Sequence, residues 1–131
     1  MAHKVTVVRI RKEASGNVND ELQWLGNSLG LFNLRDKDSS CFRVFITLVK
    51  RAKQNTPITS DDVAGRLRLS RGTVVHHLNK LMDSGIVVKE KQGYLLRESN
   101  LQDIINDLQK DMEGVFSQLK NVAKEIDNKL T

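Results

Sequence analysis

The sequence predicts a mainly helical chain with one small β-hairpin and a long carboxyl-terminal helix. Residues 59–85 read as two capped helices joined by a tight turn, and residues 86–97 read as a hairpin about a glycine. From residue 101 onward, apolar side chains recur at alternating steps of four and three residues. We therefore divide the chain into an amino-terminal part over 1–38, a central domain over 39–98 and a terminal helix over 99–131.

Size and composition predict a soluble globular protein. Of its 131 residues, 39% are hydrophobic and 28% are charged, and no apolar run is long enough to span a bilayer. Since no signal peptide is visible either, we expect a cytoplasmic protein with no membrane partner. Cys41 is the single cysteine, which excludes an internal disulfide and suits a reducing compartment.

Positive charge gathers ahead of the terminal helix. Residues 1–97 carry 17 Lys and Arg against 9 Asp and Glu, whereas residues 98–131 carry 4 against 7. The net charge of +5 therefore divides into +8 and −3. A basic excess of this kind neutralises phosphates, so nucleic acid is the expected partner of the central domain.

The amino-terminal part predicts a strand and a short helix. Val5, Val7 and Ile10 alternate with charged or polar residues over residues 4–12, which is typical of a strand. Leucines recur at helical spacing over residues 20–29. A lone strand is not stable, so we expect this part to pack on the central domain or to pair across a dimer.

The central domain begins with a helix from Ser39 or Ser40, one of which serves as its cap, to about Gln54. Its apolar stripe is predicted to consist of Phe42, Phe45, Val49 and Ala52, widened by Ile46 and Leu48. Pro57 ends anything helical before Ile58, which suits a short strand at that position.

The next two helices have clear caps. Thr59 and Asp62 resemble a capping box, Ser70 is a second N-cap, and Gly85 is a suitable residue after a helix end. Two helices, a tight turn and a basic hairpin are the outline of a winged helix-turn-helix. The second helix of such a domain enters the DNA major groove.

We expect the outward face of that second helix to contact double-stranded DNA. Val74, Leu78 and Leu81 fix its core face by their spacing. The residues expected at the DNA are Arg68, Ser70, Arg71, Gly72, Thr73, Val75, His76, Asn79 and Lys80, with Lys89 and Lys91 on one face of the wing strand. The Lys and Arg side chains can bind phosphate or guanine, and Asn79 can hydrogen-bond adenine. For each polar residue taken alone, a solvated side chain that contacts no DNA is an equally good interpretation.

The terminal helix predicts a dimer. Its heptad positions are Leu101, Ile105, Leu108, Met112, Val115, Leu119, Val122 and Ile126. A helix of about 30 residues is about 45 Å long, too long to bury this stripe on so small a domain. We expect it to form a coiled coil with its copy, parallel or antiparallel; folding back on its own domain is the alternative.

The segment from Leu69 to Val87 resembles the recognition helix and first wing strand of ArsR-like and MarR-like winged-helix regulators, and is especially similar to archaeal ones. The likeness covers about residues 40–97 and implies a dimer that binds operator DNA and usually represses. The paired cysteines of metal-sensing members are missing, because residues 60–67 hold neither cysteine nor histidine. His76 and His77 are adjacent on a helix and point apart, so we expect no metal.

The sequence therefore predicts a homodimeric, sequence-specific DNA-binding transcription regulator, with repression as the expected outcome. The alternatives are a sequence-blind chromatin protein and a winged-helix module that binds proteins. We expect no enzyme and no cofactor, since the chain has neither a Walker-type glycine loop nor a G-x-S-x-G motif. The sequence assigns no small-molecule effector.

Overall fold

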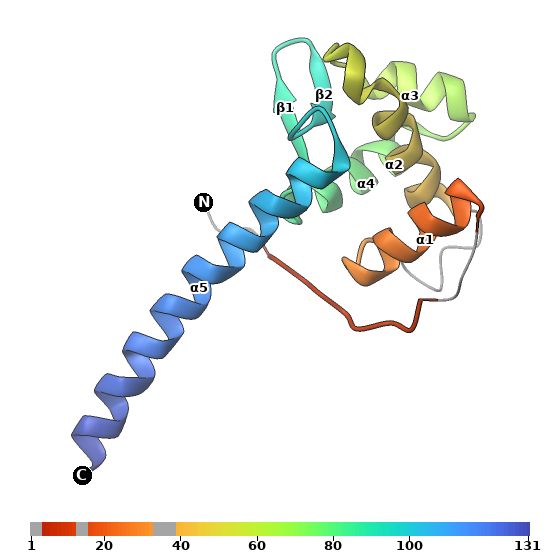
Figure 1. The fold of residues 1–131 in the computed structure, drawn as a ribbon. Helices are drawn as coiled ribbons and strands as arrows, with labels where there is room; N and C mark the ends of the chain where they lie inside the picture. The colour runs from red at the N-terminus through yellow and green to blue at the C-terminus, as the bar shows by residue number, and fades with distance from the viewer. Residues whose placement is uncertain (1–3, 13–15, 33–38) are drawn as a thin grey trace.

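The computed structural model describes residues 4–12, 16–32 and 39–131. Its elements, in chain order, are α1 (Val18–Ser28), α2 (Ser40–Arg51), the 3-10 helix η1 (Ala52–Gln54), α3 (Ser60–Leu67), α4 (Arg71–Asp83), β1 (Val87–Glu90), β2 (Gly93–Leu96) and α5 (Leu101–Leu130). Helices α1 to α4 and the hairpin gather into one body, from which α5 projects (Figure 1). The predicted fold class is confirmed: mainly helical, with a small wing and a long terminal helix.

The core lies where α2, α3 and α4 meet. Val63 of α3 and Val74, Leu78 and Leu81 of α4 have no exposed surface, as their spacing predicts. In α2 the buried face is rotated from the predicted one, because this helix packs against both α4 and β2. It consists of Cys41, Val44, Phe45, Leu48 and the following Ala52, whereas the predicted Phe42, Ile46 and Val49 are only half-buried.

The start of α2 also differs from the prediction. Ser39 is the N-cap residue by position, but its backbone is left-handed with a φ of 50° and its side chain makes no capping hydrogen bond. The hydroxyl of Ser40 instead hydrogen-bonds the ring of His77 in α4, with 2.7 Å between Oγ and Nε2. Ser40 is thus the first residue of α2, and this hydrogen bond joins α2 to α4.

The wing is closed by a short backbone bridge. Strands β1 and β2 are antiparallel with Val87 opposite Leu96 and Glu90 opposite Gly93, and residues 91–92 form the turn. Ile58 makes a β-bridge to Tyr94 through two hydrogen bonds of 2.8 and 2.9 Å. The short strand expected at Ile58 is thus reduced to one bridge, and it ties the start of α3 to the wing.

The strand predicted over residues 4–12 does not form within the chain. These residues have no regular structure and run past α1 (Figure 1), making separate hydrogen bonds from Lys4 N to Asp83 O and from Val8 N to Ser28 O. Among the described residues no strand lies beside them, so the alternating pattern has no ladder to join there. Packing on the rest of the chain was one of the two expected arrangements. The predicted part over 1–38 also includes residues 1–3, 13–15 and 33–38, which lie outside the described residues.

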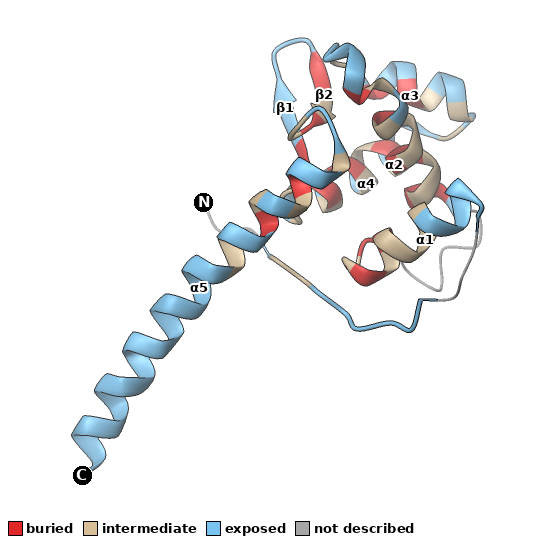
Figure 2. Ribbon diagram, in the orientation of Figure 1, coloured by how far each residue is buried: buried red, intermediate tan, exposed pale blue. Residues whose placement is uncertain are grey.

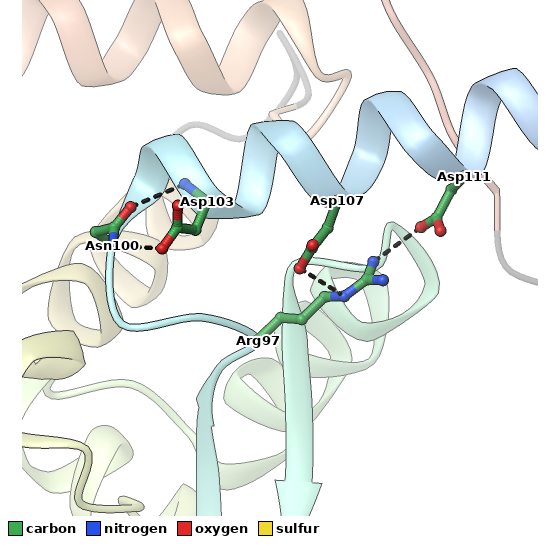
Figure 3. Close-up of polar contacts among 5 residues, drawn as sticks. All are labelled: Arg97, Asn100, Asp103, Asp107 and Asp111. Atoms are coloured by element: carbon green, nitrogen blue, oxygen red, sulfur yellow. Dashed lines mark hydrogen bonds and ion pairs between the residues drawn. The ribbon is translucent and has the colours of Figure 1, made fainter.

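The first two turns of α5 dock on the domain. Ile104 and Leu108 are buried there, and Asn100 caps the helix by accepting a hydrogen bond from Asp103 N at 2.8 Å. Arg97, just after β2, reaches across to α5 (Figure 3). Its Nη1 lies 2.8 Å from Asp111 Oδ2 and its Nε lies 3.3 Å from Asp107 Oδ2. These contacts fix the direction in which α5 leaves the wing.

Hydrogen bonds and, after them, neighbouring charges raise two pKa values at this junction. The hydrogen bond to Asp111 raises the pKa of Arg97, so this guanidinium stays charged at any ordinary pH. A hydrogen bond to Asp107, followed by the charge of Asp107, raises the pKa of the neighbouring Glu98. The junction is therefore a cluster of carboxylates held together by one arginine.

The predicted heptad stripe divides into two parts. Leu108 is buried in its own domain, so the prediction that it pairs with a second helix is wrong, whereas for the half-buried Leu101 and Ile105 that pairing stays a prediction. The reason is that Ile104, outside the stripe, turns this face of α5 onto the domain. Beyond Met112 every residue is exposed (Figure 2), including Val115, Phe116, Leu119, Val122 and Ile126.

Among the described residues, none of the helices combines the length and the apolar character needed to cross a membrane.

We predict that Gly93→Ala destabilises the wing and Gly65→Ala does not. Gly93 has a φ of +139°, and a Cβ there would lie 2.5 Å from the carbonyl oxygen of Ile58. We expect a loss of about 3 kcal/mol in the free energy of unfolding, measured with urea. Gly65 lies in helix α3 with nothing within 4 Å of its added Cβ. The same change there should stabilise the protein by about 0.5–1 kcal/mol, and equal effects at the two positions would contradict this account.

Candidate nucleic-acid interface

Helix α4 begins at the surface with a formed cap. The hydroxyl oxygen of Ser70 accepts a hydrogen bond from Thr73 N at 3.1 Å, as the sequence predicts. Ser70, Arg71 and Gly72 are exposed, and a Cβ on Gly72 would meet nothing within 4 Å. A ligand can therefore approach the first turn of α4 down to the backbone, where the helix end favours an anion.

The turn before α4 is held by two features that the sequence did not predict. Arg68 ends α3 in a left-handed conformation with a φ of 55°, a position where glycine is the commoner residue. The guanidinium of Arg43 in α2 donates to the carbonyl oxygen of Leu67 at 2.5 Å. The carbonyl oxygen of Leu67 at the end of α3 thereby has a hydrogen-bond donor. The side chain of Arg68 remains exposed.

The outward face of α4 is accessible along its length. Arg71, Gly72, His76 and Asn79 are exposed, while Thr73, Val75 and Lys80 are half-buried. Because Val74, Leu78 and Leu81 are fully buried, helical geometry turns the other residues away from the core. The structure thus brings the residues predicted on α4 to one surface.

Histidines 76 and 77 differ as the sequence predicts. His76 is exposed, whereas His77 is half-buried at the edge of the core and contacts Ser40. Their ring centroids lie 5.4 Å apart with the ring planes at 57°. The contact with Ser40 ties α4 to α2, so His77 positions the helix and does not belong to its outward face.

A groove joins the start of α4 to the wing. It has a volume of about 370 Å³. Its lining comes from the start of α3, from α4 and from the hairpin, and consists of Thr59, Ser60, Arg71, Val75, Lys89, Glu90, Lys91, Gln92, Gly93 and Tyr94. Three cations against one carboxylate give this groove a positive charge, which suits a phosphate. Four of these lining residues are predicted from the sequence, namely Arg71, Val75, Lys89 and Lys91. The other lining residues are not.

The two wing lysines do not share a strand face, so that part of the prediction is wrong. Lys89 is in β1, whereas Lys91 is in the turn that follows, because the strand already ends at Glu90. The ammonium of Lys89 lies 5.5 Å from the ring centroid of Tyr94. This cation–π contact holds Lys89 over the groove and leaves Lys91 at the tip of the wing.

Arg71 is paired only loosely. Its Nε lies 3.5 Å from Oδ1 of Asp61 in α3, and both side chains are about three-quarters exposed, at 73% and 74%. An exposed pair of this kind contributes at most about 1 kcal/mol, and salt screens it. Arg71 can therefore leave Asp61 for a phosphate at little cost.

Comparison with known proteins identifies the segment that carries this surface. Residues 54–89, from the end of η1 to Lys89, match the family model described as bacterial regulatory protein, arsR family. No curated protein and no solved structure matches the chain. The resemblance to ArsR-like winged-helix regulators is confirmed for this segment, whereas the archaeal type stays a prediction.

We predict that the cap of α4 is stabilising and chemically replaceable. Ser70→Ala removes the acceptor for Thr73 N and should lower the free energy of unfolding by about 1 kcal/mol. Ser70→Asp supplies another cap acceptor and should stay within about 0.3 kcal/mol of the natural protein. Urea unfolding of both variants tests this, and an equal loss in the two would show that the cap contributes nothing.

Proposed function

We propose that this chain, a DNA-binding transcriptional regulator with an ArsR-type winged helix-turn-helix, acts as a sequence-specific homodimeric repressor. The observation that carries the proposal is that the outward face of α4 adjoins a groove lined by three cations against one carboxylate, with Arg71 and Val75 belonging to both. On this surface backbone contacts and base contacts are both available. Repression rests on the resemblance to regulators that occupy operator DNA.

The proposed contacts are of two kinds: those that hold the protein on the DNA backbone and those that recognise bases. Arg68, Lys89 and Lys91 lie at the turn and the wing on either side of α4, where they take phosphates. Ser70 and Gly72 let a phosphate approach the amide groups of the first turn. Arg71, Thr73, Val75, His76, Asn79 and Lys80 face the major groove, where Asn79 suits adenine and the methyl groups of Thr73 and Val75 suit thymine.

The proposed dimer forms through the outer part of α5. Val115, Leu119, Val122 and Ile126 keep heptad spacing over this part and are each about half exposed, at 49–57%. Phe116 and Leu130 extend the same apolar surface. A helix that leaves its apolar stripe in water is stabilised by a partner with the same stripe, and a second copy supplies one.

A twofold dimer sets the form of the DNA site. Two copies of α4 enter successive major grooves, so the operator is a palindrome whose half-sites are about 34 Å apart. Footprinting on selected genomic fragments should reveal two protected half-sites with that period. Equal retention of random DNA would instead indicate a sequence-blind chromatin protein.

We predict that the double variant Arg71→Ala with Lys80→Ala binds operator DNA about 10- to 100-fold more weakly than the natural protein. It loses two cations of the α4 surface, so the slope of log K against log salt should fall by about 2. Fluorescence anisotropy with a labelled operator, titrated at several salt concentrations, measures both values.

The matched control is Lys110→Ala with Lys124→Ala. It removes the same charge from exposed positions of α5 and should leave operator affinity and salt slope within about twofold. If the α4 variant retained DNA as well as this control does, the winged helix would be a protein-binding module.

We predict that Leu119→Asp with Val122→Asp makes the protein monomeric. Two carboxylates in an apolar seam cannot be buried together, so the helices separate. Sedimentation of the full chain should show a dimer for the natural protein and a monomer for the variant. A truncation after Ser99 is less informative, because it also removes the buried Ile104 and Leu108.

The control for this experiment adds the same charge to the other side of α5. Ser117→Asp with Asn121→Asp changes exposed residues that lie outside the heptad stripe and should remain dimeric. A natural chain that sediments as a monomer at tens of micromolar, or a dimer that survives both variants, would remove the coiled coil from the proposal.

A further inference from the structure

A second groove lies between α1 and the first turn of α5. Leu22, Trp24 and Leu25 of α1 form its walls together with Leu101 of α5. Its volume is about 290 Å³, which is at the small end of the range for ligand pockets. None of its lining residues belongs to the proposed DNA surface, and the ArsR family match does not reach it.

Two charged residues, Lys12 and Glu21, contribute to the lining of this groove. The ammonium of Lys12 lies 5.9 Å from the ring centroid of Trp24, and Glu21 is exposed in the first turn of α1. The indole Nε1 donates to the carbonyl oxygen of Ile10 at 3.2 Å, which fixes the ring against the amino-terminal segment. The groove thus combines an apolar wall, a positioned aromatic ring and one ammonium group.

One ammonium group lies at the aromatic wall of this groove. The charged residues of the lining are Lys12 and Glu21, and the ammonium of Lys12 lies over the ring of Trp24. A ligand with a negative head beside Lys12 gains from this ammonium group, whereas a cation would have to displace Lys12 from the face of Trp24.

From these observations we infer that the groove binds a small amphipathic anion, an apolar chain that ends in a carboxylate. The chain lies against the leucines and Trp24, and the carboxylate accepts hydrogen bonds from the ammonium of Lys12. Because Leu101 is the first residue of α5, an occupant also adds contacts between α1 and the terminal helix. The binding itself does not rest on the proposed DNA function.

Three probes with the same chain and different heads test the inference on the full-length protein. They are octanoate, octan-1-ol and octylamine, none of which absorbs where tryptophan does. Trp24 is the only tryptophan of the chain, so its fluorescence reports the groove directly. We expect a saturable change with octanoate at a Kd of about 1 mM, with the alcohol and the amine at least about fivefold weaker.

Two exposed substitutions should act in opposite directions. Lys12→Gln should abolish the preference for octanoate over octan-1-ol, and Glu21→Gln should tighten octanoate by about twofold to fivefold. A matched control, Lys50→Gln, removes a cation from an exposed position of α2. It should change neither the preference for octanoate over octan-1-ol nor the affinity for octanoate. The change should persist in the monomeric Leu119→Asp, Val122→Asp variant, which separates ligand binding from a second copy that covers the groove.

Several results would overturn the inference. One is the absence of any saturable change up to about 10 mM octanoate. Another is tighter binding of octylamine than of octanoate. A third is equal binding of all three probes, unaffected by Lys12→Gln, which would describe an apolar surface without a site for an anion. Loss of DNA binding in the Arg71 and Lys80 variant would leave all of these measurements unchanged.

Discussion

The burial of one face of α4 is the constraint on which the site depends. Val74, Leu78 and Leu81 have no exposed surface, and they pack where α2 and α3 meet. A helix turns by a fixed angle per residue, so burying these three side chains decides which others reach solvent. The contacts from Ser40 to His77 and from Arg43 to Leu67 hold α4 and the turn before it in the same arrangement. Core packing of one face of α4 therefore determines which of its residues form the positive surface on the other face.

The parts of the fold that could be predicted are those set by local chemistry. The caps at Thr59 and Ser70, the end of α4 near Gly85 and the core face of α4 each depend on residues within a few positions of one another. The rotation of α2 could not be predicted, because Val44 and Phe42 are equally apolar and only the neighbouring helix and β2 select between them. The strand over residues 4–12 failed for the same reason: alternation predicts a strand, but a strand requires a neighbour.

The exposed residues of the candidate site could be predicted on α4, whereas those of the groove beside it could be predicted less well. A helix in isolation shows its outward residues by periodicity, which is how Arg71, His76 and Asn79 were found. The groove next to them is assembled from segments that approach only in the folded chain, since the bridge from Ile58 to Tyr94 brings the start of α3 against the wing. Ser60 and Tyr94 carry no signal in the sequence that places them in this groove, and Thr59 is recognisable there only as a helix cap. Lys91 was misplaced because the length of a strand depends on its pairing, and β1 already ends at Glu90.

Helix α5 joins the domain that carries the proposed DNA surface to the proposed dimer contact. A short junction with several contacts sets its direction. Ile104 and Leu108 bury its first turns, and Arg97 joins the end of β2 to Asp107 and Asp111 (Figure 3). A continuous helix transmits any change of direction at this junction along its whole length, so a small rotation there displaces the far end by many ångströms. In a dimer held at the far end, the same rotation instead changes the separation of the two α4 helices. In the proposed dimer, the few contacts around Arg97 and Leu101 would therefore determine how well two half-sites are matched, and a ligand between α1 and Leu101 would act at the point where that geometry is set.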